Sequence, residues 1–210
     1  MIKILKCNDN NYIKKVKNFL DKRLSNKLVK TEIVTQILKD VKKNKITALL
    51  KYEKQFSNNT EIKPKLNKIH KSVKSLSPKI KKAIDFAYNR IFKFHSQQKI
   101  NNILYKDKYN NKLEYKNIPI QSIGVYVPSN LPSTLLMNAI PAKIAGVKRI
   151  VLANPKSNGK LNPAVLYAAK KIGIKEIYSM GGAQAIASLA YIQKVNKIIG
   201  PGNIYVAKAK

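Results

Sequence analysis

The sequence predicts an α/β fold in which a mostly helical N-terminal region precedes a mainly parallel α/β domain. Two opposite gradients of composition support this. Nine of the ten acidic residues precede residue 120, whereas all eight glycines lie at Gly124 or later. Short apolar runs alternate with helical patterns only in the second part, which favours strands joined by right-handed crossovers. We place the boundary near Pro119 and expect residues 1–119 to be helical and residues 120–210 to form the α/β domain.

The first region carries apolar residues at helical spacing in four stretches. They predict helices over residues 10–23, 31–43, 47–56 and 78–95. Ser77 is suited to cap the longest helix and Pro78 to occupy its first turn. Asn110-Asn111, between tyrosine-rich flanks, predicts a hairpin turn. Neither His70 nor His95 has a partner at a metal-ligand spacing, so we expect no metal site here.

The second region alternates four apolar runs with four helical patterns. The runs predict strands over residues 122–127, 149–153, 176–180 and 197–199. The helical patterns cover residues 133–145, 163–172 and 185–191, with a last helix starting at Asn203. Ser133 and Asn162 are suited to cap the first two of these helices. In a parallel sheet the loops at the carboxyl ends of the strands form the ligand crevice, which is where Tyr126, Gln184 and Asn203 fall.

Two glycine-rich turns follow the last two strands, at Gly181–Gln184 and Gly200–Asn203. Glycine permits positive φ and close approach of a ligand, and the helix after each turn directs unpaired N–H groups towards it. This combination suits the phosphates of a nucleotide. The alternative is that both are tight strand-to-helix turns without a ligand.

The net charge of +32 would usually indicate a polyanion partner. However, the basic residues are almost all lysine, and Arg23, Arg90 and Arg149 are the three arginines. The lysines are scattered through every segment, and asparagine and isoleucine are also abundant, as expected from A/T-rich codons. We therefore expect no specific nucleic-acid partner, although weak, salt-sensitive polyanion binding would follow from the charge.

The remaining composition predicts a cytoplasmic protein. There is no apolar run of about 18 residues, so no membrane span is expected. The N-terminus lacks the apolar core of a secretory signal. The single cysteine, Cys7, cannot form an internal disulfide, which fits a reducing compartment.

Five blocks of sequence, in one order, resemble the histidinol dehydrogenase family. They are Gly124–Pro128, Pro132–Val147, Glu176–Tyr178, Gly181–Ala187 and Gly200–Asn203. Ile91–His95 with Gln98 is similar to the family's pattern at the end of its long N-terminal helix. The resemblance is dense over residues 91–210 and loose before them. Several ordered blocks form a more specific signal than one glycine-rich loop.

The resemblance implies a homodimeric, zinc-dependent oxidoreductase of histidine biosynthesis with a Rossmann-like domain. Such an enzyme oxidises L-histidinol to L-histidine and reduces two NAD. The family's NAD-contacting residues correspond to Tyr126, Gln184 and Asn203. Its catalytic base, zinc ligands and most substrate contacts lie further along than this chain runs. The expectation is therefore a domain truncated at its C-terminus, with no catalytic or metal-binding residue, that carries the NAD side of the enzyme and is inactive alone.

Three interpretations of such a half-length chain remain open. It is a fragment or one piece of a split enzyme that needs a separate C-terminal piece, a degraded remnant, or a non-catalytic nucleotide-binding module. One departure from the family bears on them. The family has a longer loop that contains a Gly-Gly pair, and this chain has the shorter Ser129–Leu131 in its place. Side chains with a Cβ limit close backbone approach to a cofactor.

Overall fold

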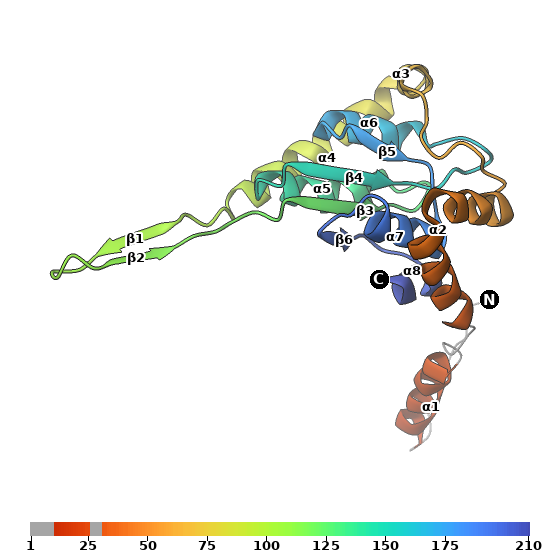
Figure 1. The fold of residues 1–210 in the computed structure, drawn as a ribbon, viewed down its shortest axis with the longest axis horizontal. Helices are drawn as coiled ribbons and strands as arrows, with labels where there is room; N and C mark the ends of the chain where they lie inside the picture. The colour runs from red at the N-terminus through yellow and green to blue at the C-terminus, as the bar shows by residue number, and fades with distance from the viewer. Residues whose placement is uncertain (1–10, 26–30) are drawn as a thin grey trace.

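The computed structural model describes residues 11–25 and 31–210, so Cys7 lies outside the described residues. The first region forms helices and one hairpin, whose bounds are α1 (Tyr12–Ser25), α2 (Thr31–Ser57), α3 (Leu66–Lys74), α4 (Pro78–Ser96), β1 (Ile103–Lys106) and β2 (Lys112–Tyr115). Figure 1 shows their order along the chain. The predicted helical N-terminal region and hairpin are thus confirmed.

The two predicted helices at residues 31–43 and 47–56 are the halves of α2. They join at Lys45, whose φ of 50° and ψ of −124° are not helical. A backbone with positive φ at a non-glycine residue bends the element sharply. The bend divides α2 into two arms, and both reach the α/β domain. Short helix α3 was not predicted, although Leu66, Ile69 and Val73 have helical spacing.

Helix α4 begins as its sequence predicts. The Ser77 side chain accepts a hydrogen bond from the N–H of Ile80, and Pro78 occupies the first turn. At the far end, Nδ1 of His95 lies 2.5 Å from Oε1 of Gln98, so this histidine is engaged locally. The two β-strands that follow pair antiparallel around the turn at Asn110, whose φ is 67°.

The second region forms a four-stranded parallel sheet. Its strands are β3 (Ser122–Tyr126), β4 (Arg149–Ala153), β5 (Glu176–Tyr178) and β6 (Lys197–Ile199). They lie in the order β5-β4-β3-β6, and every neighbouring pair is parallel. This is the 3-2-1-4 order of a doubly wound nucleotide-binding sheet, in which the direction of winding reverses between the first and fourth strands. Here the reversal lies between β3 and β6 (Figure 1).

The connecting helices are α5 (Pro132–Ile144), α6 (Pro163–Ile172), α7 (Gly182–Tyr191) and α8 (Ile204–Ala209). Asn162 caps α6 as predicted, accepting the N–H of Ala164 at 2.8 Å. Ser133 as the cap of α5 is wrong, because Pro132 already occupies the first turn and Leu131 stands at the cap position. Helix α7 begins three residues earlier than predicted, so Gln184 lies in its first turn.

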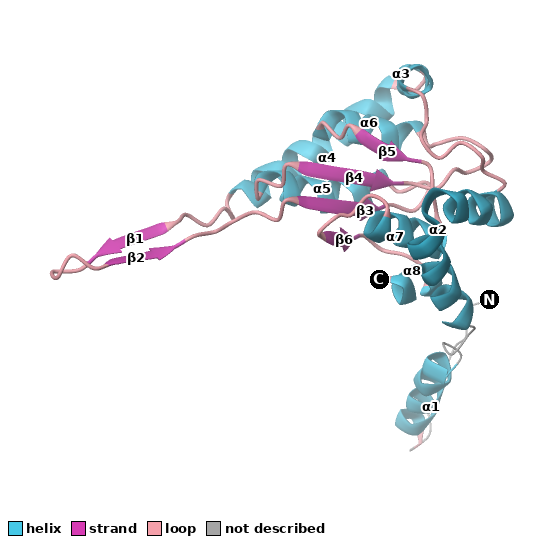
Figure 2. Cartoon of the chain, in the orientation of Figure 1, coloured by secondary structure: helices cyan, strands magenta, loops and turns pink. Residues whose placement is uncertain are grey.

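Both faces of the sheet are buried, and alternate residues along the strands face opposite ways. Ile123, Val125 and Leu152 belong to a core with α3, α4, α5 and α6. Strand residues that face the other way, such as Tyr126 and Val151, belong to a second core. That core is formed with α2, α7 and α8. Figure 2 shows the sheet between these helices.

Helices of the first region therefore take part in the cores of the second. The N-terminal half of α2 packs on α7 through Val34, Ile37 and Val41 against Ala183 and Ala187. The division into domains at residues 1–119 and 120–210 stays a prediction. Within the described parts of the chain, no helix is both long enough and apolar enough to cross a membrane.

The hairpin β1–β2 projects far from the body of the protein (Figures 1 and 2). All eight of its strand residues are exposed. They include Leu104, which is 70% exposed, and Leu113, which is 61% exposed. Apolar side chains on both faces of an isolated two-stranded ribbon gain little from folding alone. This arm thus differs from the buried parallel sheet.

Candidate functional site

The end of β3 and the loop after β6 meet at the reversal point of the sheet. Gly200 has a φ of 111° and lies so close to β3 that an added Cβ would overlap the carbonyl oxygen of Tyr126. Three residues on, the Asn203 side chain caps α8 by accepting the N–H of Val206 at 3.1 Å. Asn203 is exposed, so its amide nitrogen lies at the surface of this edge.

The Tyr126 side chain reaches from β3 to the start of α7. Its hydroxyl accepts the N–H of Gly182 at 3.3 Å, and the residue is 6% exposed. Burial raises the pKa of the Tyr126 phenol; the hydrogen bond from Gly182 opposes this, and the nearby Glu53 charge adds to it. The phenol therefore stays protonated near neutral pH, keeping an O–H donor at this edge of the sheet.

Gln184 lies beside Tyr126, in the first turn of α7, and is 2% exposed. Its Nε2 donates to Oε1 of Glu53 at 3.0 Å. The N–H of Gly181 donates to the same oxygen at 2.8 Å. Gly182 has a φ of 63°, and a Cβ there would come within 2.7 Å of Oε1 of Gln184. The Gln184 side-chain amide therefore lies between the Glu53 carboxylate and the backbone of Gly182, which carries no side chain.

Glu53 belongs to the C-terminal half of α2 and is 1% exposed. Its second oxygen accepts from Nδ2 of Asn59 at 3.4 Å, and Nζ of Lys156 donates to Oδ1 of Asn59 at 2.7 Å. Burial raises the pKa of the Glu53 carboxyl, whereas hydrogen bonds from Gly181, Gln184 and Asn59 and the charge of Lys156 oppose the rise. A buried acid is tolerated when its oxygens are paired in this way.

This arrangement bears on the two interpretations of the Gly181–Gln184 turn. The N–H that a phosphate would meet first is bound by the protein's own carboxylate. Gly181 is extended, with φ −135° and ψ 179°, and an added Cβ would lie 2.8 Å from Cβ of Pro155. Packing against Pro155 thus accounts for that glycine without a ligand. The geometry therefore favours the tight-turn interpretation of the Gly181 end of this turn.

The structure brings the predicted site residues to one edge of the sheet. Tyr126 and Gln184 converge on the first turn of α7, and Asn203 follows the glycine that abuts Tyr126. Glu53 was not predicted. The signal that could have found it is its position four residues after Leu49, which puts an acid next to the buried stripe of α2.

Asn154 adds a buried amide at the end of β4. It is 0% exposed, and its Nδ2 donates to the carbonyl oxygens of Val127 and Pro128 at 3.0 and 3.2 Å. Its Oδ1 has no hydrogen-bond partner within the described chain. An unpaired buried acceptor is uncommon in native proteins and is satisfied by a ligand or an ordered water. This acceptor lies at the same edge as Tyr126, because Asn154 directly follows Ala153, the residue that pairs with Tyr126 in the sheet register.

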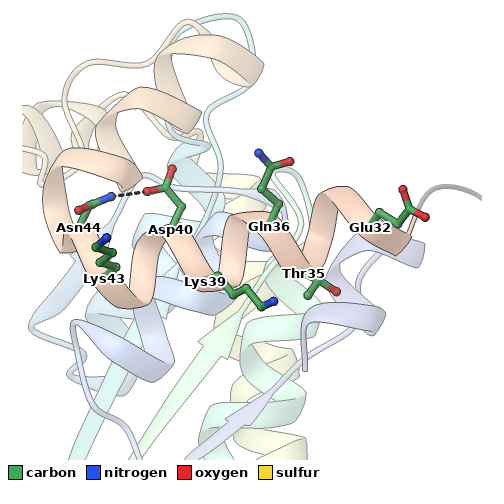
Figure 3. A pocket seen from close by; sticks show the side chains of 7 residues that line it. All are labelled: Glu32, Thr35, Gln36, Lys39, Asp40, Lys43 and Asn44. Atoms are coloured by element: carbon green, nitrogen blue, oxygen red, sulfur yellow. Dashed lines mark hydrogen bonds between the residues drawn. The ribbon is translucent and has the colours of Figure 1, made fainter.

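Two hollows lie away from this edge. One of about 580 Å³ is lined by seven polar side chains that all come from α2. Figure 3 shows them along one side of the helix, with Asn44 donating to Asp40 at 2.6 Å. The other, of about 830 Å³, lies where the hairpin joins the body and includes His95, Asn102 and Asn138. Neither gathers the acids and bases of a catalytic centre.

The described residues contain no group of three or more His, Cys, Asp or Glu side chains that could hold a metal ion. They therefore do not fit a zinc site. The chemistry that this part of the chain offers is hydrogen bonding from a phenol and two amides at the edge of a parallel sheet.

Comparisons with known proteins agree on one family. The family model described as histidinol dehydrogenase matches residues 20–210. The histidinol dehydrogenase of Pelagibacter ubique is 55% identical over 217 residues, covering 100% of this chain and 51% of that protein. Histidinol dehydrogenase 1 of Trichormus variabilis is 39% identical over 216 residues, covering 99% of this chain and 50% of that protein.

The fold is shared as well. The crystal structure of histidinol dehydrogenase from Elizabethkingia anophelis superposes with a TM-score of 0.80 at 39% identity, covering 85% of this chain and 44% of that one. The chain thus spans about half the length of the curated relatives it matches. The match runs through both the N-terminal helices and the parallel sheet. This chain belongs to the histidinol dehydrogenase family.

Proposed function

We propose that this chain supplies the NAD-binding side of a histidinol dehydrogenase, which oxidises L-histidinol to L-histidine with two NAD in the cytoplasm. The observation that carries the proposal is that Tyr126 and Asn203 lie at the reversal point of a 3-2-1-4 parallel sheet, with Gln184 in the helical turn that Tyr126 contacts. Family membership supplies the reaction. The sheet supplies the place at which such folds bind nucleotides.

The side chains at this edge fit a nucleotide through neutral hydrogen bonds. The Asn203 amide nitrogen is exposed, Tyr126 offers a hydroxyl, and Oδ1 of Asn154 is an unpaired acceptor. Ribose hydroxyls and a carboxamide present the matching donors and acceptors. NAD, when bound, supplies the hydride acceptor. The chain's own residues would bind it and orient it along the sheet edge.

Zinc is implied by the family, but the described residues do not fit a zinc site. In this proposal, substrate and metal are held by the part of the enzyme that this chain does not span, and residues 1–210 are inactive alone. Proton abstraction and hydride transfer need groups from both pieces in one site.

A homodimer is the proposed assembly, and the hairpin β1–β2 supports it. The arm exposes an isoleucine, two leucines and two tyrosines in its strands: Ile103, Leu104, Tyr105, Leu113 and Tyr115. Contiguous exposed apolar surface marks interaction sites more often than free surface. A second copy that covers the arm would bury these side chains, which are exposed in the monomer.

The test is reconstitution of the reaction. The chain is mixed with the separately produced second half of the Pelagibacter ubique relative, zinc, NAD and L-histidinol. Formation of NADH is measured by its ultraviolet absorbance. We expect NADH from the mixture and none from either piece. Failure of the mixture, with both pieces folded by circular dichroism, contradicts the proposal.

Asn203 allows a matched pair of variants in that mixture. Asn203→Ser keeps a good helix cap but removes the amide, whereas Asn203→Asp keeps a cap and adds a charge. If the amide contacts the nucleotide, both variants raise the KM for NAD by about tenfold, the loss expected for one hydrogen bond of about 1.4 kcal/mol. An unchanged KM in both would restrict Asn203 to capping α8.

A second function fits the same edge: a nucleotide-binding module without catalysis. It is favoured by the lack of a candidate metal cluster within residues 11–25 and 31–210. The two functions separate in the same assay. Saturable NAD binding by calorimetry, without NADH formation in any mixture, would favour the module.

A further inference from the structure

Glu53 is the one charged residue among the buried polar residues that the structure describes. Burying an unpaired carboxylate is costly, so its position calls for compensating partners. They are present: two donors to Oε1, from Gly181 and Gln184, and one to Oε2, from Asn59. The two donors to Oε1 both come from the start of α7.

The contacts of Glu53 cross the molecule. It lies in α2, in the first region, and its donors lie 128 and 131 positions later in the chain. Leu49, one turn before it, packs in the core with Ile186 and Leu189 of α7. The carboxylate is thus carried to the turn by a well-packed helix, which fixes where its oxygens stand.

The Gln184 side chain is held by this carboxylate. With Nε2 bonded to Glu53, Oε1 lies over the Cα of Gly182, where a Cβ would come within 2.7 Å. Removing the acceptor would leave Nε2 and the N–H of Gly181 unpaired in a buried place, which favours another rotamer or a shifted turn. The Gly182 N–H that meets Tyr126 belongs to the same turn.

We propose that Glu53 is a positioning residue that holds Gln184 and the first turn of α7 in the arrangement that receives the cofactor. The inference rests on the proposed NAD role of Gln184. Glu53 does not touch the cofactor and acts through Gln184. Its acceptor oxygen matters for this, and its negative charge does not.

Two substitutions separate the acceptor from the charge. Glu53→Gln keeps an oxygen that can accept from Gly181 and Gln184 but removes the charge. Glu53→Asp keeps the charge but withdraws the carboxylate by one methylene. The matched control is Glu61→Gln, since Glu61 also lies near Lys156, at 3.9 Å, but its side chain bonds Lys68 instead of α7.

The first measurement is hydrogen exchange of the Gln184 side-chain amide by NMR, which needs no cofactor. Loss of one buried hydrogen bond corresponds to about tenfold faster exchange. We expect this in Glu53→Asp and little change in Glu53→Gln or Glu61→Gln. Equal exchange in all four proteins would overturn the positioning of Gln184.

The second measurement is NAD affinity by calorimetry on the same proteins. We expect Glu53→Asp to raise the Kd by about tenfold and Glu53→Gln by less than about threefold. In a Gln184→Ala background, Glu53→Asp should have no further effect, because the residue through which it acts is gone. The proposal is overturned if Glu53→Gln, which removes the charge, weakens NAD binding more than Glu53→Asp does. It is also overturned if Glu53→Asp still weakens NAD binding in the Gln184→Ala background.

Failure of the proposed function gives a different pattern. If the wild-type chain shows no NAD binding, the cofactor role of the site is wrong for this chain, whatever Glu53 does. If NAD binds but neither Glu53 variant changes the Kd, the cofactor role stands and the positioning role is wrong. Thermal denaturation of each variant confirms that the proteins compared are folded.

Discussion

The parallel sheet and the hairpin use the same kinds of residue in opposite ways. All five residues of β3 are buried, whereas all eight strand residues of β1 and β2 are exposed. The sheet is covered by helices on both faces, while the hairpin projects from the body with nothing beside it (Figure 1). Strand formation therefore depends on the local pattern, but stability depends on what covers the strand.

The largest expected effect is at the sheet edge, where Gly200→Ala should prevent normal folding. The new Cβ would overlap the carbonyl oxygen of Tyr126, and the φ of 111° is already strained for any other residue. Because that atom is backbone in a buried strand, it has no easy way to move. We expect a loss above about 5 kcal/mol in the free energy of unfolding, measured by urea denaturation.

Gly159→Ala is the control for that substitution. Its φ is 73°, but no atom lies within 4 Å of the added Cβ. It should cost about 1 kcal/mol, the strain of the left-handed backbone alone. If the two alanine variants lose the same amount, backbone strain rather than overlap with Tyr126 sets the cost at Gly200.

Two leucines compare the sheet and the hairpin directly. Leu152 in β4 is 0% exposed and Leu104 in β1 is 70% exposed. Leu152→Ala should lower the free energy of unfolding by about 2–5 kcal/mol through lost burial and a cavity. Leu104→Ala should change it by less than about 0.5 kcal/mol in the monomer. Urea denaturation measures both changes, at a protein concentration at which a single species sediments.

The same leucine variant sharpens the role proposed for the arm. If the hairpin joins two copies, Leu104→Ala should shift the sedimentation coefficient towards that of the monomer. Leu152→Ala should not, at a temperature at which that variant is folded. A stability loss for Leu104→Ala as large as for Leu152→Ala would show instead that the arm packs on its own body.

A small, pH-dependent effect is expected from an ion pair between sheet strands. Arg149 in β4 donates from Nε and Nη2 to the two oxygens of Glu176 in β5, both at 2.8 Å. The hydrogen bond from Arg149, more than its charge, lowers the pKa of the Glu176 carboxyl. This pair therefore stabilises the folded protein above the ordinary glutamate pKa, and the contribution is lost as pH falls through the lowered pKa.

Glu176→Gln measures that contribution. Between about pH 6 and pH 3 the wild type should lose up to about 1 kcal/mol more than the variant, since both side chains are about a third exposed. The hairpin control is Glu114→Gln, whose partner Lys116 lies at 2.7 Å with 57% of its side chain exposed. Chemical denaturation across the pH range gives both differences. A larger effect at Glu114 would reverse the comparison.

Much of the fold could be predicted from the sequence because its signals are local. The Asn162 cap, the Ser77-Pro78 helix start and the alternation of strands with helices are each written in a few adjacent residues. The break between the helices at residues 31–43 and 47–56 was predicted, but the backbone conformation of Lys45 was not, because lysine carries no preference for it. The cap at Ser133 failed because Pro132 competes for the helix start.

The site could be predicted only in part, for a related reason. The sequence placed Tyr126, Gln184 and Asn203 at strand ends, where parallel topology brings loops together. Glu53 lies between lysines on a helix and looks like any surface acid. Its partners are far along the chain, so its position four residues after Leu49 is the local signal that marks it.

That separation also sets a timetable for synthesis. Glu53 is synthesised 128 residues before Gly181. At roughly 5–20 residues per second, its carboxylate waits roughly 6–26 seconds for its partners at the start of α7. During that interval the C-terminal half of α2 has no surface on which to dock, because α7 has not been made. The docking of α2 is therefore completed only after one of the last helices has been made.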